Sequence, residues 1–99
     1  MGAKIIWSPG AKKSLEELVS FLETKWEKKV IENLFSELND SLKHISLNPE
    51  MFPLVSTSKN IRKCVIKRKT LLLYRVKSKD IIEVVILVDS RQNPKKYKI

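Results

Sequence analysis

The first half of the chain contains two series, or stripes, of apolar residues at helical spacing, and in one continuous helix they would lie on different faces. Residues 11–47 contain neither glycine nor proline, so no residue there compels a helix to end. The first stripe is Ala11, Leu15, Leu18, Leu22 and Trp26, and the second is Ile31, Leu34, Leu38, Leu42 and Ile45. The first stripe would continue through Lys29, Asn33 and Ser36, so the second lies about half a turn away from it. A break within residues 24–28 brings both stripes onto one core, which predicts a helical hairpin.

The boundaries of this hairpin carry local signals. Ser8 is a favoured N-cap residue, and Pro9 suits the first helical position because an N–H has no helical partner there. The second helix is expected to end at Asn48-Pro49, since the residue before a proline is displaced from the helical backbone region. Residues 4–7 precede the hairpin and have the composition of a short strand, with Trp7 expected to pack in the core.

Three apolar runs of strand length fill the second half, at residues 61–66, 71–76 and 81–88. They are rich in Val, Ile and Leu and contain no glycine or proline, and the short polar links between them predict hairpins. In the third run Ile82, Val84, Ile86 and Val88 are expected to share one apolar face. The opposite face is apolar apart from one acid, which indicates a central strand.

Residues 50–59 join the helices to these strands. Pro53 and the polar run Ser56-Thr57-Ser58 predict that this connector has no regular structure. The resulting element order is β-α-α-β-β-β. We therefore predict a single α+β domain over residues 1–99, with a helical hairpin packed on one face of a mainly antiparallel four-stranded sheet.

The net charge of +9 lies entirely in the second half of the chain. Residues 1–49 carry seven cations and seven acids, whereas residues 50–99 carry thirteen cations and four acids. A one-sided basic field fits an anionic partner, either nucleic acid or an acidic protein, although excess charge also serves solubility. The cations considered for RNA or partner binding are Arg62, Lys63, Lys67, Arg68, Arg75, Lys95 and Lys96.

Other kinds of site find little support in the sequence. Cys64 is the single cysteine, which excludes an internal disulfide and fits a reducing compartment. His44 is the single histidine and is expected to be a surface residue of the second helix. No cluster has metal-ligand spacing and no glycine-rich phosphate loop is present, so we expect no metal and no cofactor. No run approaches membrane-spanning length, and we expect a cytoplasmic protein that does not bind membranes.

The element order and five motifs together resemble the RelE/ParE superfamily of toxins from bacterial type II toxin–antitoxin systems. The motifs are Trp7-Ser8-Pro9, Asn48-Pro49, Ile61-Arg62-Lys63, Leu72-Leu73-Tyr74-Arg75-Val76 and Ile86-Leu87-Val88-Asp89-Ser90-Arg91-Gln92-Asn93-Pro94. The resemblance implies a toxin that a cognate antitoxin neutralises, usually an acidic protein that wraps around it. It also implies one of two activities: RelE-like members cut messenger RNA on the ribosome, and ParE-like members poison DNA gyrase.

The residues that match the nuclease branch are few. Arg91 matches an arginine that RelE-like nucleases use against the scissile phosphate, and Tyr97 matches a C-terminal tyrosine at the same spacing, so both are catalytic candidates. Lys63, Lys67 and Arg68 could supply the lysines of the first hairpin. The nuclease arginine of the middle strand falls on Leu71, while Arg75 is displaced by four residues along the same face. The structural alternatives are a salt bridge between Arg91 and Asp89, and a packing role for Tyr97.

Three functions therefore stay open from the sequence. The first is a ribosome-dependent mRNA endonuclease that uses Arg91 to grip phosphate and Tyr97 as acid or base. The second is a ParE-like toxin that inhibits DNA gyrase, which the leucine at position 71 favours. The third is a non-toxic module that binds only an antitoxin or RNA.

Overall fold

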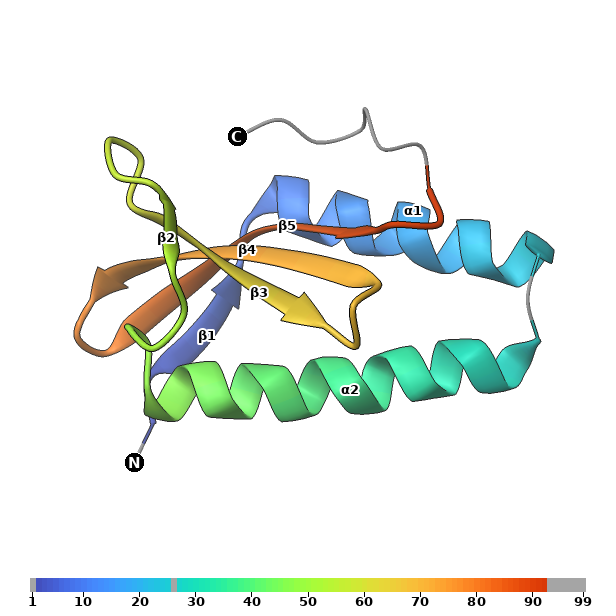
Figure 1. Ribbon diagram of the computed structural model, residues 1–99, viewed down its shortest axis with the longest axis horizontal. Helices are drawn as coiled ribbons and strands as arrows, with labels where there is room; N and C mark the ends of the chain where they lie inside the picture. The colour runs from blue at the N-terminus through green and yellow to red at the C-terminus, as the bar shows by residue number, and fades with distance from the viewer. Residues whose placement is uncertain (1, 26, 93–99) are drawn as a thin grey trace.

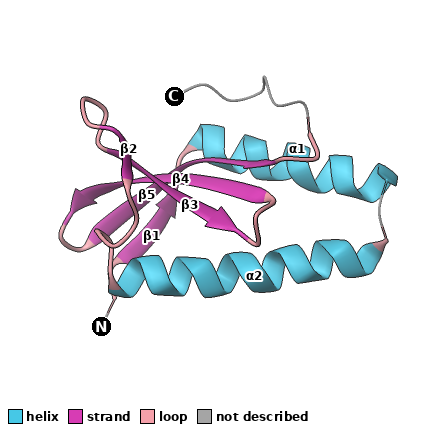
Figure 2. Cartoon of the chain, in the orientation of Figure 1, coloured by secondary structure: helices cyan, strands magenta, loops and turns pink. Residues whose placement is uncertain are grey.

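The computed structural model describes residues 2–25 and 27–92, which form two helices and a five-stranded sheet (Figure 1). The elements in chain order are β1 Lys4–Trp7, α1 Pro9–Lys25, α2 Lys28–Leu47, β2 Leu54–Ser56, β3 Ile61–Ile66, β4 Thr70–Ser78 and β5 Ile81–Asp89. Figure 2 shows the two helices as an antiparallel pair beside the sheet. The predicted fold class, an α+β fold with a helical hairpin on a mainly antiparallel sheet, is confirmed.

The helical hairpin begins, breaks and ends where its local signals predicted. Ser8 caps α1: its Oγ accepts a hydrogen bond from the Ala11 N–H at 3.0 Å. Helix α1 ends at Lys25 and α2 begins at Lys28, so the break that joins the two apolar stripes lies within the predicted interval. Helix α2 ends at Leu47, directly before Asn48-Pro49.

The strands are ordered β1-β5-β4-β3-β2 across the sheet. β3, β4 and β5 form the two predicted antiparallel hairpins, and β1 pairs in parallel with β5. A parallel pair needs a long crossover connection, and here both helices and three further strands lie between the two partners in the sequence. The first strand of the chain therefore closes the sheet beside the last.

A fifth strand, β2, lies within the connector and was not predicted. It pairs antiparallel with β3 through Leu54 opposite Arg62 and Ser56 opposite Ile61. Pro53 precedes it without disturbing the sheet, because the Pro53 carbonyl accepts a hydrogen bond from the Lys63 N–H at 3.0 Å and no proline N–H is needed. The prediction that residues 50–59 lack regular structure is wrong for this short edge strand.

The residues of β5 that point into the core alternate differently before and after Val85. Leu73 lies opposite Ile86 but the next residue, Tyr74, lies opposite Val84, so Val85 is an extra residue that forms a bulge. Ile82, Val84 and Leu87 consequently belong to the core beneath the helices, whereas Ile86 and Val88 do not. The prediction that Ile82, Val84, Ile86 and Val88 share a face is wrong, because one inserted residue reverses the alternation.

The core lies between the helical hairpin and one face of the sheet. Leu18, Leu22 and Ile45 from the helices have no exposed surface, and Leu72 and Tyr74 from β4 are equally buried. Trp7 packs against this core, as expected, and Cys64 lies inside it with 3% of its surface exposed. Burial raises the pKa of the Cys64 thiol, with a smaller opposing effect from a hydrogen bond with Ser41.

Ser14 joins α1 to β5 through a buried hydrogen bond. Its Oγ donates to the Ala11 carbonyl at 2.8 Å and accepts from the Leu87 N–H at 3.0 Å, just beyond the bulge. Ser14→Ala would leave that buried N–H without an acceptor, so we expect the free energy of unfolding to fall by about 2 kcal/mol in urea denaturation. Ser20→Ala, at an exposed position of the same helix, is the matched control and should change it by less than about 0.5 kcal/mol. Equal effects at the two positions would contradict the assigned role.

Candidate functional site

One face of the sheet carries no helix, and we call it the open face. Its residues on β3, β4 and β5 are Lys63, Val65, Leu71, Leu73, Arg75, Glu83, Ile86 and Val88. Strand alternation places them here, because Cys64, Leu72 and Tyr74 point into the core under the helices. Arg75 and Leu71 lie on the same face, as predicted. The centre of the open face is apolar, and its charged side chains lie toward the ends of the strands.

The β3–β4 hairpin ends in a three-residue loop, Lys67-Arg68-Lys69, whose first two residues form the centre of a tight turn. The Ile66 carbonyl accepts a hydrogen bond from the Lys69 N–H at 3.1 Å, and both turn residues have left-handed backbone angles, with φ of 52° for Lys67 and 62° for Arg68. Lys67, Arg68 and Lys69 are all exposed. The turn therefore places three consecutive cations at one end of the sheet.

Two hollows flank this turn. The first, of about 190 Å³, lies on the α2 side and is lined by Val30, Asn33, Leu34, Glu37, Lys67, Lys69, Thr70 and Arg91. The second, of about 320 Å³, lies on the open face and is lined by Val55, Lys63, Val65, Arg68, Lys69, Thr70, Leu71, Val88 and Ser90. The predicted binding residues Lys63, Lys67 and Arg68 are therefore brought to one region, together with Lys69.

Arg91 follows β5 and is bound to a buried carboxylate. Its Nε donates to Asp89 Oδ1 at 2.6 Å and its Nη2 donates to Asp89 Oδ2 at 2.7 Å. Thr70 Oγ1 donates to the same Oδ2 at 2.9 Å, and the Arg91 N–H donates to Oδ1 at 2.9 Å. The salt bridge that was the structural alternative for Arg91 is therefore present.

The charges of this pair stabilise each other. Burial by itself raises the pKa of Asp89, but the hydrogen bonds from Arg91 and Thr70 outweigh it and hold the pKa below its ordinary value. The same hydrogen bond, together with the nearby Glu37 carboxylate, raises the pKa of Arg91. Both groups are ionised at neutral pH, and Asp89 neutralises the charge that Arg91 brings to the first hollow.

Two other predicted binding residues, Arg62 and Arg75, lie apart from this region. Arg62 lies on the helix side of β3, where its Nη1 donates to the carbonyls of Glu50 at 3.1 Å and Phe52 at 2.7 Å. It therefore holds the connector against the sheet. Arg75 lies on the open face near the other end of β4, with its Nε 3.8 Å from Glu83 Oε1.

Tyr97, Lys95 and Lys96 lie outside the described residues, so no geometry bears on their predicted roles.

His44 is exposed on α2, as expected. Among residues 2–25 and 27–92 no three His, Cys, Asp or Glu side chains are grouped to hold a metal ion. No helix in the same part of the chain is long and apolar enough to cross a membrane.

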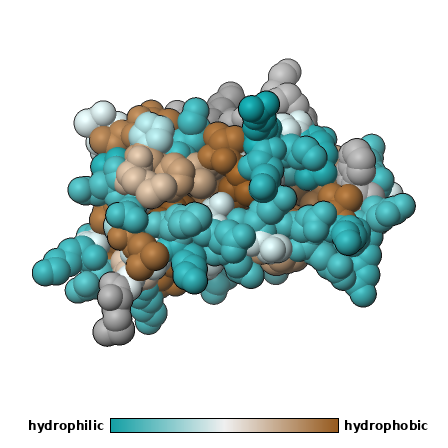
Figure 3. All heavy atoms as spheres, turned by 60° about the horizontal axis from the view of Figure 1, so that its bottom comes forward, coloured by the Kyte–Doolittle hydropathy of each residue, from teal (hydrophilic) through white to brown (hydrophobic). Residues whose placement is uncertain are grey.

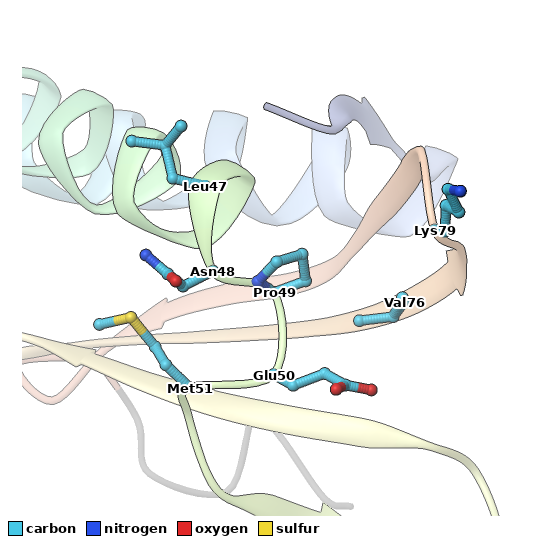
Figure 4. A pocket seen from close by; sticks show the side chains of 7 residues that line it. All are labelled: Leu47, Asn48, Pro49, Glu50, Met51, Val76 and Lys79. Atoms are coloured by element: carbon cyan, nitrogen blue, oxygen red, sulfur yellow. The ribbon is translucent and has the colours of Figure 1, made fainter. Parts of the chain in front are cut away.

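A third hollow, of about 530 Å³, lies at the opposite end of the sheet where α2 meets the connector (Figure 4). Its lining is Leu47, Asn48, Pro49, Glu50, Met51, Val76 and Lys79. In Figure 4 the side chains of Glu50 and Met51 leave the connector in opposite directions, and Leu47 and Met51 are more than half exposed. Figure 3 turns α2 toward the viewer and shows a mainly hydrophilic face with apolar side chains between the polar ones. The lining of this hollow mixes apolar side chains with Asn48, Glu50 and Lys79.

Sequence reasoning did not assign three residues of the region around the turn. Lys69 was visible as the third member of a run of cations. For Thr70 and Gln92 the sequence contained no indication of a role in this region. Thr70 donates to Asp89, and Gln92 Oε1 accepts from the Asp89 N–H at 2.9 Å. The Thr70 contact exists because the β3–β4 turn and the exit of β5 lie side by side, where the Ser90 N–H donates to the Lys69 carbonyl at 2.6 Å. The Gln92 contact is local, between residues three apart at the exit of β5.

Comparison with known proteins identifies one family. Residues 5–94 match the model of the family described as "ParE toxin of type II toxin-antitoxin system, parDE". A chain of the chromosomal ParDE system from P. aeruginosa superimposes with a TM-score of 0.71 at 13% identity, covering 88% of this chain and 95% of that one. A conserved hypothetical protein from Helicobacter pylori gives 0.58 at 22% identity, covering 93% and 98%. No curated protein matches the sequence.

Proposed function

Because this chain belongs to the ParE toxin family of type II toxin–antitoxin systems, we propose that it arrests growth by inhibiting DNA gyrase. The toxin assignment and the existence of a cognate antitoxin follow from the family. The choice of gyrase as the target is our inference, and it rests on the chemistry of the open face.

The observation that carries this choice is the surroundings of Leu71. It lies at the position where a RelE-like nuclease places an arginine, and its cross-strand neighbours are Val65 on β3 and Val88 on β5. RNA cleavage needs groups that activate a hydroxyl, hold the phosphate and protonate the leaving oxygen. This row offers only aliphatic side chains, and Arg91 is already bound to Asp89 through two nitrogens.

Purified toxin added to DNA gyrase and relaxed plasmid should abolish supercoiling, and the cognate antitoxin should restore it. In a translating extract the same toxin should leave messenger RNA intact, as primer extension would show. Cleaved messenger together with unimpaired supercoiling would overturn the proposal. Normal growth on induction without the antitoxin would instead indicate a binding module without toxicity.

A ribosome-dependent nuclease is the second candidate, and one observation favours it. Lys63, Arg68 and Lys69 surround the hollow on the open face, where they would hold RNA phosphates. In that case Arg91→Ala should abolish cleavage of ribosome-bound messenger RNA. The two candidates are thus separated by the same pair of assays.

A further inference from the structure

Exposed apolar side chains gather where α2 meets the connector. Leu47 is 55% exposed, Met51 57% and Leu54 43%. The described residues expose six large apolar side chains, and these three of them lie within residues 47–54. Single exposed apolar residues are ordinary on a soluble protein, whereas a group of them at one place is typical of a surface that binds another molecule.

The backbone that presents these side chains is held firmly against the sheet. The Tyr74 hydroxyl donates to the Pro49 carbonyl at 2.7 Å. Arg62 Nη1 donates to the carbonyls of Glu50 at 3.1 Å and Phe52 at 2.7 Å, on the two sides of the exposed methionine. A binding surface that is already ordered loses little conformational entropy on association. The exposed side chains are therefore displayed on a backbone that is prepared for binding.

The hollow of Figure 4 has an apolar end and a charged end. Leu47 and Met51 lie toward one end, and the side chains of Glu50 and Lys79 lie toward the other, where Val76 forms part of the wall. Neither Glu50 nor Lys79 forms an ion pair with a residue of 2–25 or 27–92. Both charges are thus available to a partner.

The arrangement of these groups selects the class of partner. A phosphate backbone would be repelled by Glu50 and would leave Leu47 and Met51 uncovered. A polypeptide can place an apolar side chain against these two residues, with a cation opposite Glu50 and a carboxylate opposite Lys79. The surface therefore fits a protein, and it lies at the opposite end of the sheet from the basic β3–β4 turn (Figure 1).

We propose that the corner surface, made of residues 47–51 with Val76 and Lys79, is where the toxin contacts its target protein. Under the proposed function the partner is a segment of DNA gyrase that carries an apolar side chain between a cation and a carboxylate. The apolar side chain fills the hollow against Leu47 and Met51, and the two charges pair with Glu50 and Lys79. The identity of the target rests on the proposed function, but the location of the surface does not.

Met51→Asp tests the apolar end of the hollow. It would bury an unpaired carboxylate in the complex, so the toxin concentration that halves gyrase supercoiling should rise about 30-fold. The melting temperature should fall by less than about 4 °C, because the Met51 side chain is already 57% exposed. Phe35→Asp is the matched control, since Phe35 is 38% exposed on α2 and does not line this hollow. Its half-inhibitory concentration should change less than about threefold.

Lys79→Glu tests the charged end. It places a carboxylate opposite the carboxylate of the partner, so the half-inhibitory concentration should rise about tenfold. Lys77→Glu makes the same change of charge in the same hairpin, at an exposed residue that does not line the hollow. It should change the half-inhibitory concentration by about twofold or less, because its charge acts only through solvent.

Growth arrest on induction separates this proposal from the choice of gyrase. If the wild type leaves gyrase active but arrests growth, and Met51→Asp relieves the arrest while Phe35→Asp does not, the surface is supported and gyrase is overturned as the target. Full inhibition and full arrest by Met51→Asp would overturn the surface. Equal losses in Lys79→Glu and Lys77→Glu would also overturn it, by indicating a general effect of charge. A wild type that neither arrests growth nor inhibits gyrase would overturn both proposals.

Discussion

Asp89→Asn is expected to lower the free energy of unfolding by about 4 kcal/mol at pH 7, because it breaks a buried ion pair from one side. The Asp89 side chain is fully buried and its carboxylate accepts hydrogen bonds from Arg91 and Thr70. The substitution leaves the Arg91 guanidinium without its counter-charge and places an amide NH₂ where two donors already converge. In a chain of 99 residues this corresponds to a fall of about 20 °C in melting temperature, measurable by circular dichroism.

The double variant Asp89→Asn with Arg91→Gln is the control for this effect. It removes both charges, so it should be destabilised by about 2 kcal/mol, less than Asp89→Asn alone. Thr70→Val removes only one neutral donor to the carboxylate and should have the smallest effect, about 1 kcal/mol. A double variant less stable than Asp89→Asn would show that the ion pair is not the source of the loss.

The pH dependence of the wild type should reflect the same pair. A carboxyl whose pKa is lower in the folded than in the unfolded state contributes stability above its unfolded pKa and loses it as the pH falls through the folded pKa. The pKa of Asp89 is lowered by its hydrogen bonds to Arg91 and Thr70. The free energy of unfolding should therefore fall below about pH 4 in the wild type and fall less steeply in Asp89→Asn.

The sequence predicts those parts of the fold that depend on local periodicity. The phase difference between the apolar stripes of the two helices requires a break, and α1 ends at Lys25 while α2 begins at Lys28. Ser8 and Pro9 favour the start of α1, and Pro49 favours the end of α2, through effects that act within a few residues. The three runs that became β3, β4 and β5 needed only strand composition and short polar links. None of these predictions requires knowledge of tertiary contacts.

The features of the fold and of the site that the sequence did not predict depend on contacts between residues far apart in the chain. The bulge at Val85 has no local signature, because Val-Val-Ile is equally suited to a regular strand; it is set by the register of β5 against β4. Strand β2 exists because Arg62 and β3 hold the connector in place. The sequence left the role of Arg91 open, since a phosphate ligand and a partner of Asp89 look alike until the carboxylate is seen to be buried.

Tyr74→Ala is expected to cost about 4 kcal/mol of the free energy of unfolding, comparable to the loss at Asp89. Tyr74 is the largest fully buried side chain of the described residues, and its ring meets Phe52 edge to face with centroids 6.4 Å apart. Its hydroxyl donates to the Pro49 carbonyl at 2.7 Å, so the ring joins the core to the connector that Arg62 holds from β3. Removing the Tyr74 side chain opens a cavity in the core and breaks the hydrogen bond that holds Pro49, which lines the hollow of Figure 4.

Tyr74→Phe separates the ring from the hydroxyl. It keeps the packing and should lose only the hydrogen bond, about 1 kcal/mol at pH 7. Burial raises the pKa of Tyr74 to about 12, despite an opposing effect from Arg62. Because the unfolded tyrosine ionises near pH 10, the wild type should lose about 3 kcal/mol between pH 10 and 12, whereas Tyr74→Phe should not show this loss. Guanidinium denaturation at several alkaline pH values measures it, and parallel curves for the two proteins would mean that the phenol is not buried in solution.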